Sequence, residues 1–268
     1  MRHLTSALLA ALLFHALPAG AAAENHECGP AVLATLGREL KVAHFAPSPN
    51  DFGKDPAGVV LASSCKRMPG DPRLTLAAVG WDTHEEDTKG LAVAIVDEAD
   101  GAVVAVHREE VDEDASTRMN NGSLRLDTAP YELAPGVRAF GLDFFSDEMG
   151  CGEGKLGPRR TLYVREGRTL RPVLQDLAVA ESWYLRGNQP RCVSDQHEAE
   201  TAILESYDVT IALGAPGKGG WRDLALTVTA RRDDHKASRL KPLHVRVPWD
   251  GQSYPLDAFD KAQAQWRK

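Results

Sequence analysis

The sequence predicts an all-β fold, in which antiparallel hairpins form a β-sandwich or a propeller-like domain with short peripheral helices. Short runs rich in β-branched and aromatic residues recur along the chain. Turn residues, mainly glycine, proline and asparagine, separate these runs at short intervals. The runs do not alternate with long amphipathic helices, which argues against a parallel sheet with crossover helices.

The first 23 residues have the pattern of a secretory signal peptide. Arg2 precedes an apolar run from Ala7 to Leu17, and small residues follow up to Ala23. The apolar run is shorter than the roughly 20 residues that span a bilayer, so an N-terminal membrane anchor is the less favoured alternative. We expect a secreted or periplasmic protein of a Gram-negative bacterium that does not span the membrane.

The expected mature chain, residues 24–268, is long enough to bury its own core. We predict that it forms one mainly-β domain, with a subdivision near residue 150 as the alternative. Short helices are expected at 29–40, next to Cys28, and at 257–268. The expected strands and hairpins lie at 58–65, 73–81, 91–110, 123–144, 161–174, 201–213, 221–234 and 243–256.

Turn chemistry supports the hairpins in chain order. The arms of 91–110 are rich in valine and alanine and flank a turn that ends at Gly101. Residues 123–144 hold two apolar alternations, broken by Pro130 and by Pro135–Gly136. The second of these arms is apolar on both faces, which predicts burial between layers.

The later hairpins follow the same logic. Gly167 marks the turn of 161–174, and Asp250–Gly251 marks the turn of 243–256. The glycine-rich stretch 214–220 has neither the spacing nor the strand-then-helix context of a phosphate-binding loop, so it is expected to be a hairpin loop.

Four cysteines are present in a chain that is expected to enter an oxidising compartment. Their even number predicts two disulfides, for which three pairings are possible. We expect neighbours in the sequence to pair, Cys28 with Cys65 and Cys151 with Cys192. A metal site is disfavoured because the chain has no C-x-x-C motif.

The formal net charge is −7, and this value includes Arg2, so the expected mature chain carries −8. Acidity of this kind disfavours nucleic acid and anionic membrane surfaces as partners. It leaves a basic protein of the envelope, or a cation, as the expected type of partner. The alternative is that the charge only keeps a secreted protein soluble.

Two acidic segments are candidate binding loops. In an extended conformation Asp82, His84 and Glu86 share one face and could bind a partner or a divalent ion, and a solvated loop is the alternative. Asp112 and Asp114 follow the first positions of a calcium loop, but that loop lacks its central glycine and its closing glutamate. We therefore expect no cofactor, with calcium as the one open possibility.

Adjacent aromatic residues, Trp183 and Tyr184, precede a polar segment and form a third candidate binding site. The alternative is that they cap the core. No G-x-S-x-G motif or other catalytic signature is present, and no pair of carboxylates stands out for glycosidase chemistry.

Three stretches carry a resemblance to known proteins: SLRLDTAPYELAPGVRAFGLDF, LYVREGRTLRPVL, and GWRDLALTV together with WDGQSY. Over most of the mature chain the sequence resembles uncharacterised secreted or periplasmic proteins of proteobacteria that have no known activity. The last stretch also resembles hairpins of propeller-like extracellular proteins. The resemblance implies an extracytoplasmic β-protein and supplies no catalytic motif.

We therefore expect a non-enzymatic periplasmic binding protein, such as an inhibitor or immunity-type partner of an envelope enzyme. A hydrolase of envelope polymers is one alternative, and it requires convergent acids or a metal in one cavity. A structural envelope protein without separable activity is the other.

Overall fold

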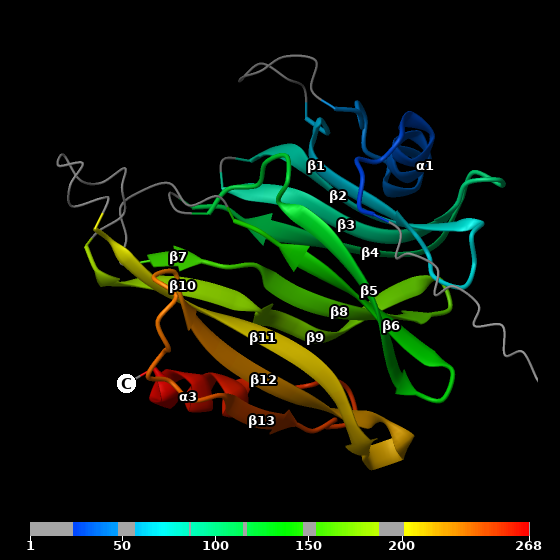
Figure 1. The fold of residues 1–268 in the computed structure, drawn as a ribbon. Coiled ribbons are helices and arrows are strands. Elements are labelled where there is room, and N and C mark those ends of the chain that lie inside the picture. Colours follow the sequence, from blue (N-terminus) through cyan, green and yellow to red (C-terminus); the bar gives the residue numbers. More distant parts are fainter. Residues whose placement is uncertain are drawn as a thin grey trace, which may run out of the picture.

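The computed structural model describes residues 24–47, 57–85, 87–114, 117–146, 154–187 and 201–267, and it confirms the all-β fold (Figure 1). Strands account for 57% of the structure and helices for 11%. The strands form two sheets, of which the larger curls into a half-barrel and the smaller packs against part of its convex face. The predicted signal peptide lies outside the described residues.

The first sheet has eight strands in the order β1-β2-β3-β4-β9-β8-β6-β5. Its strands are β1 Val60–Arg67, β2 Leu74–Glu85, β3 Thr88–Asp97, β4 Ala102–Asp112, β5 Leu124–Ala134, β6 Val137–Phe144, β8 Arg159–Glu166 and β9 Thr169–Ala178. The second sheet has five strands, β7 Gly154–Leu156, β10 Ala180–Arg186, β11 Ile203–Pro216, β12 Arg222–Arg232 and β13 Leu243–Val247.

The larger sheet curls until its two edge strands, β1 and β5, approach each other. All eight strands contribute to the group of buried apolar side chains on the concave face, among them Leu91, Leu142 and Tyr163. Met119, from the loop between β4 and β5, also packs into this core. The concave face is therefore filled with side chains over most of its length.

Asn25 joins the two edges of the curled sheet. Its side-chain amide donates to the Leu126 carbonyl of β5 at 3.1 Å, and the Leu126 amide donates to Asn25 Oδ1 at 3.0 Å. The same oxygen accepts from Ser64 Oγ of β1 at 3.0 Å. Backbone bonds between His26 and Cys65 hold this N-terminal segment against β1. The segment thus satisfies backbone groups that two exposed sheet edges would otherwise leave unpaired.

The Cys28–Cys65 disulfide is confirmed. It ties the N-terminal segment to β1 beside the helix α1, Pro30–Leu40. The helix α1 lies over β1 to β4 (Figure 1), and its apolar residues pack on the convex face of these strands. The other predicted pair, Cys151 and Cys192, lies outside the described residues.

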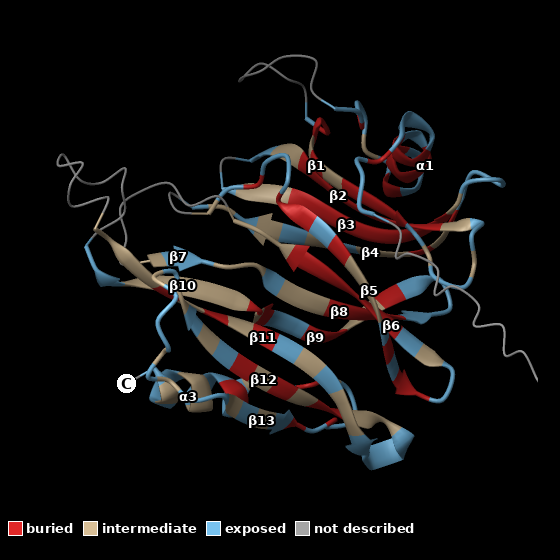
Figure 2. Cartoon of the chain, in the orientation of Figure 1, coloured by how far each residue is buried: buried red, intermediate tan, exposed pale blue. Residues whose placement is uncertain are grey.

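The convex face of β5, β6, β8 and β9 packs against the second sheet and the helix α3, Asp257–Trp266. The strand β6 lies between this core and the concave core, because Ala139 faces the first and Phe140 the second. This confirms that the second arm of the hairpin 123–144 is buried between layers (Figure 2). Pro130 does not end β5, because β5 is an edge strand and an irregularity in its pairing accommodates the proline.

The predicted hairpin at 243–256 is only half correct. Its first arm is β13, and the Asp250 carboxylate accepts from the Gln252 and Ser253 amides in the expected turn. No second strand follows. The Tyr254 amide instead donates to the Val173 carbonyl of β9 at 2.7 Å, and its ring enters the core. Burial of this aromatic side chain outweighs pairing with β13.

A chain of ion pairs lies beside the interface between the sheets. The Asp143 carboxylate of β6 is fully buried and accepts from the guanidinium groups of Arg160, at 2.6 and 2.9 Å, and Arg125, at 2.8 and 3.2 Å. Arg160 also contacts Asp127 at 2.6 Å, and Asp127 accepts from the Tyr131 hydroxyl at 2.7 Å. These bonds satisfy a buried carboxylate, which would be strongly destabilising if it were left alone.

Four core tyrosines provide a test of the packing at alkaline pH. Burial raises the pKa of Tyr131, Tyr163, Tyr207 and Tyr254 far above the ordinary value. Tyrosines of the unfolded chain ionise near pH 10, so the unfolded state loses protons first and the free energy of unfolding falls as the pH rises above about 10. We expect the ultraviolet absorbance of tyrosinate to rise over the same pH range in which the circular dichroism signal of the β-sheets is lost. A complete tyrosinate signal near pH 10 with the sheet intact would contradict this packing.

None of the helices in the described ranges has the length and the apolar run needed to cross a bilayer.

Candidate functional site

The curled sheet opens between β4 and β9. These strands run parallel and share one pair, Val106 with Thr169, in which the Val106 amide donates to the Arg168 carbonyl at 3.1 Å. The alternation of β9 turns the backbone nitrogens of Leu170 and Pro172 toward β4. Pro172 has no N–H to donate. The hydrogen-bond ladder between β4 and β9 therefore does not continue past Pro172, and the two strands separate.

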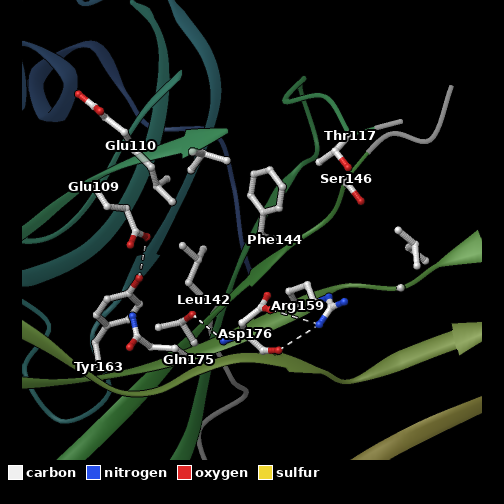
Figure 3. A pocket seen from close by; sticks show the side chains of 15 residues that line it. Glu109, Glu110, Thr117, Leu142, Phe144, Ser146, Arg159, Tyr163, Gln175 and Asp176 are labelled. Carbon is white, nitrogen blue, oxygen red and sulfur yellow. Dashed lines mark hydrogen bonds and ion pairs between the residues drawn. The ribbon is translucent and has the colours of Figure 1, made fainter. Parts of the chain in front are cut away.

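A cleft of about 420 Å³ lies at this opening and leads into the concave core (Figure 3). Its walls combine apolar side chains with a polar rim. The apolar lining residues are Leu91, Val111, Leu142, Phe144 and Leu156. Leu156 is half exposed, whereas most of the large apolar side chains that the structure describes are buried. The cleft thus offers apolar contact area that the rest of the described surface mostly lacks.

Glu109 places a carboxylate on the wall of this cleft. Ala105 and Val111 pack toward the concave core, so the alternation of β4 turns His107 and Glu109 to the same side. Glu109 Oε1 accepts from the Tyr163 hydroxyl at 3.3 Å, and Glu109 Oε2 lies 3.3 Å from His107 Nε2. Glu109 keeps about a third of its side chain exposed (35%), so a ligand in the cleft can reach it.

Tyr163 is a hydrogen-bond donor at this position. Burial and the adjacent Glu109 carboxylate raise the pKa of its hydroxyl, which therefore stays protonated. The hydroxyl and the His107 ring contact different oxygens of the Glu109 carboxylate and so fix its orientation. A carboxylate held in this way can accept hydrogen bonds from an ammonium or a guanidinium group of a ligand.

The opposite rim carries an ion pair between Arg159 and Asp176, at 3.3 Å. Asp176 lies in the left-handed region, with φ of 60°, which is uncommon for residues other than glycine. The positive φ coincides with irregular pairing between β8 and β9. In Figure 3 the Glu110 carboxylate points away from Glu109 and toward solvent. Acidic groups therefore outnumber basic groups around the cleft.

The two predicted acidic loops lie together at the end of β4. Thr88 pairs with Asp112, and the Glu113 amide donates to the Asp87 carbonyl at 2.8 Å. Lys89 contacts both Asp82, at 3.3 Å, and Glu113, at 3.7 Å. Since the second loop continues from β4 and contributes Thr117 to the cleft lining, this acidic cluster is continuous with the cleft.

Asp82 and His84 lie at the end of β2, where the regular alternation of the strand is interrupted. His84 has a φ of 65°, and the pairing of β2 with β3 shifts between Asp82 and Glu85. His84 Nε2 lies 3.9 Å from Asp82 Oδ2, so these two side chains come together. Glu86 lies outside the described residues, and the face that the three residues are expected to share stays a prediction.

Two ends of the segment compared with a calcium loop are described, and residues 115–116 between them lie outside the described residues. The Thr117 amide donates to Asp114 Oδ1 at 2.7 Å, while Asp112 belongs to β4. In the described ranges no three His, Cys, Asp or Glu side chains are grouped closely enough to hold a metal ion.

Trp183 and Tyr184 do not form one aromatic surface, because successive residues of β10 point to opposite faces of the sheet. Trp183 packs against the core between the sheets, and the Arg267 guanidinium lies 4.6 Å from its ring centroid. Its environment matches the alternative prediction, in which the aromatic pair caps the core.

Sequence reasoning missed the cleft, although two signals were present. Pro172 lies inside a predicted strand, which indicates an interrupted ladder. His107 and Glu109 place polar groups on the core-facing side of a strand that begins with valine and alanine. Together these signals mark the place where the strand β4 leaves the core.

Comparison with protein-family models, with curated proteins and with solved structures finds no match to this chain. The function must therefore be inferred from the geometry of the site.

Proposed function

We propose that this chain is a non-enzymatic binding protein of the periplasm or the extracellular space, and that it binds a basic envelope protein at the cleft between β4 and β9. The observation that carries the proposal is the Glu109 carboxylate, held by Tyr163 and His107 on the wall of an apolar cleft. An envelope enzyme that the chain inhibits is the kind of partner we favour.

Charge and compartment support this proposal. The acidic cluster at the end of β4 would attract a basic partner and accelerate its association. The Cys28–Cys65 disulfide and the signal-like N-terminus agree with an oxidising compartment outside the cytoplasm.

The first test is partner capture with a matched pair of variants. The oxidised chain 24–268 is immobilised and exposed to an envelope extract at low and moderate salt, and retained proteins are identified by mass spectrometry. Glu109→Gln removes one carboxylate from the wall of the cleft. Glu132→Gln removes an exposed carboxylate near the turn of the β5–β6 hairpin that does not line the cleft.

We expect one stoichiometric partner that binds the native chain and Glu132→Gln equally. Its affinity for Glu109→Gln should be at least about tenfold lower, because a hydrogen bond to a charged group contributes about 1.5–3 kcal/mol. Equal retention by both variants would remove the cleft from the proposal, and no retention at either salt would remove the binding function.

Hydrolysis of an envelope polymer is the second candidate, since Glu109 and Asp176 bring two carboxylates to one cleft from different strands. Incubation with peptidoglycan separates the two functions. Turnover that Glu109→Gln abolishes would replace binding by catalysis.

A further inference from the structure

The edge of β4 that faces the cleft carries backbone groups without a strand partner in the described part of the chain. The Val106 amide points toward β9, so alternation directs the amides and carbonyls of Arg108 and Glu110 to the same side. The strand β9 makes no further pair with β4 beyond Thr169, where Pro172 and the divergence of the strands end the ladder. Such a row of donors and acceptors is a template for another strand.

We infer that the partner enters the cleft as an extended segment that adds to β4 as a new strand. This inference rests on the proposed function and specifies how the partner is recognised. The stretch from Arg108 to Asp112 can pair with about five residues of an added strand. A row of alternating backbone donors and acceptors selects a polypeptide, and the cleft side chains then select its sequence.

The side chains of the cleft define that sequence. Alternate residues of an added strand face the concave core beside Glu109 and Val111. One of these residues is basic, so that its cation reaches the Glu109 carboxylate. The residue two positions away is apolar and packs against Val111, Leu142 and Phe144. The segment therefore carries a basic residue and an apolar residue two positions apart, and the direction of the added strand decides which of the two comes first.

A synthetic peptide tests the inference directly. The probe is acetyl-Val-Thr-Lys-Thr-Val-amide, and two twins carry backbone N-methyl groups, one at the odd and one at the even positions. In an added strand, alternate backbone amides of the peptide donate to β4, and an N-methyl group removes such a donor. At least one twin should therefore bind at least tenfold more weakly than the parent peptide. The parent should also slow amide hydrogen exchange at Arg108 and Glu110, and Glu109→Gln should weaken its binding at least tenfold, whereas Glu132→Gln should not.

Several results would overturn strand addition. Equal binding of the parent and both twins would show that side chains alone are recognised. Equally tight binding of acetyl-lysine amide would assign the cleft to a small amine, and a native chain that dimerises through β4 would assign the edge to a second copy. If the captured partner depends on Glu109 while the parent peptide does not bind, strand addition fails and the proposed function stands. If the parent binds through its backbone but no envelope protein is retained, the proposed partner fails and the strand site stands.

Discussion

Replacement of Arg160 by methionine is expected to lower the free energy of unfolding by about 3 kcal/mol, the lower end of the range for breaking a buried ion pair. The substitution keeps the apolar stem and removes the cation that contacts Asp143 at 2.6 Å. Asp143 is fully buried, so its carboxylate cannot recover hydrogen bonds from solvent. Arg125 remains as a partner and limits the loss. Urea unfolding followed by circular dichroism measures the change.

Two further variants separate the buried charge from general disruption. Arg125→Met removes a guanidinium that is half exposed (53%), and its cost should be about 1 kcal/mol or less. Combining Arg160→Met with Asp143→Leu removes both charges and should restore most of the stability, because an apolar pair often replaces a buried ion pair without loss. Equal destabilisation by Arg160→Met and Arg125→Met would contradict the assigned network.

Replacement of both Cys28 and Cys65 by alanine is expected to lower the free energy of unfolding by about 4 kcal/mol. The disulfide closes a loop with a sequence separation of 37, and the chain-entropy model gives this magnitude for a loop of that length. The loss should extend to the seam, by which we mean the hydrogen bonds of Asn25 with Leu126 of β5 and Ser64 of β1, since the disulfide holds Asn25 near β5. Equilibrium unfolding of the double variant, compared with the native chain under oxidising conditions, measures the effect.

Asn25→Ala provides the matched control because it breaks the seam and leaves the disulfide intact. It should cost about 1–2 kcal/mol, corresponding to its hydrogen bonds with Leu126 and Ser64. In the background that lacks Cys28 and Cys65 the same substitution should cost less, since the seam is already weakened. Full additivity of the two effects would show that the disulfide and the seam act independently.

Most elements of the fold could be predicted because their signals are local. The hairpin turns at Gly101, at Pro135–Gly136 and at Gly167 each lie where turn residues interrupt apolar runs. The absence of a second strand in 243–256 could not be predicted, since the ring of Tyr254 enters a core formed by residues remote in sequence. β10 was missed because its residues show neither the valine-rich composition nor a clear alternation.

The candidate site was predicted only in part, for a related reason. Both acidic loops could be recognised as candidates, and they lie together at the end of β4. The cleft depends on the parallel approach of β4 and β9, which pair at positions 106 and 169. The contact of Glu109 with Tyr163 spans 54 residues, and no local pattern encodes it.

The seam at Asn25 and the disulfide differ in the length of chain that each must close. Leu126 follows Asn25 by 101 residues, whereas the two cysteines have a sequence separation of 37. Closing the shorter loop costs less conformational entropy, so in an oxidising compartment the disulfide can form before Asn25 reaches β5. The disulfide thus places the N-terminal segment beside one edge of the curled sheet before that segment meets the other edge.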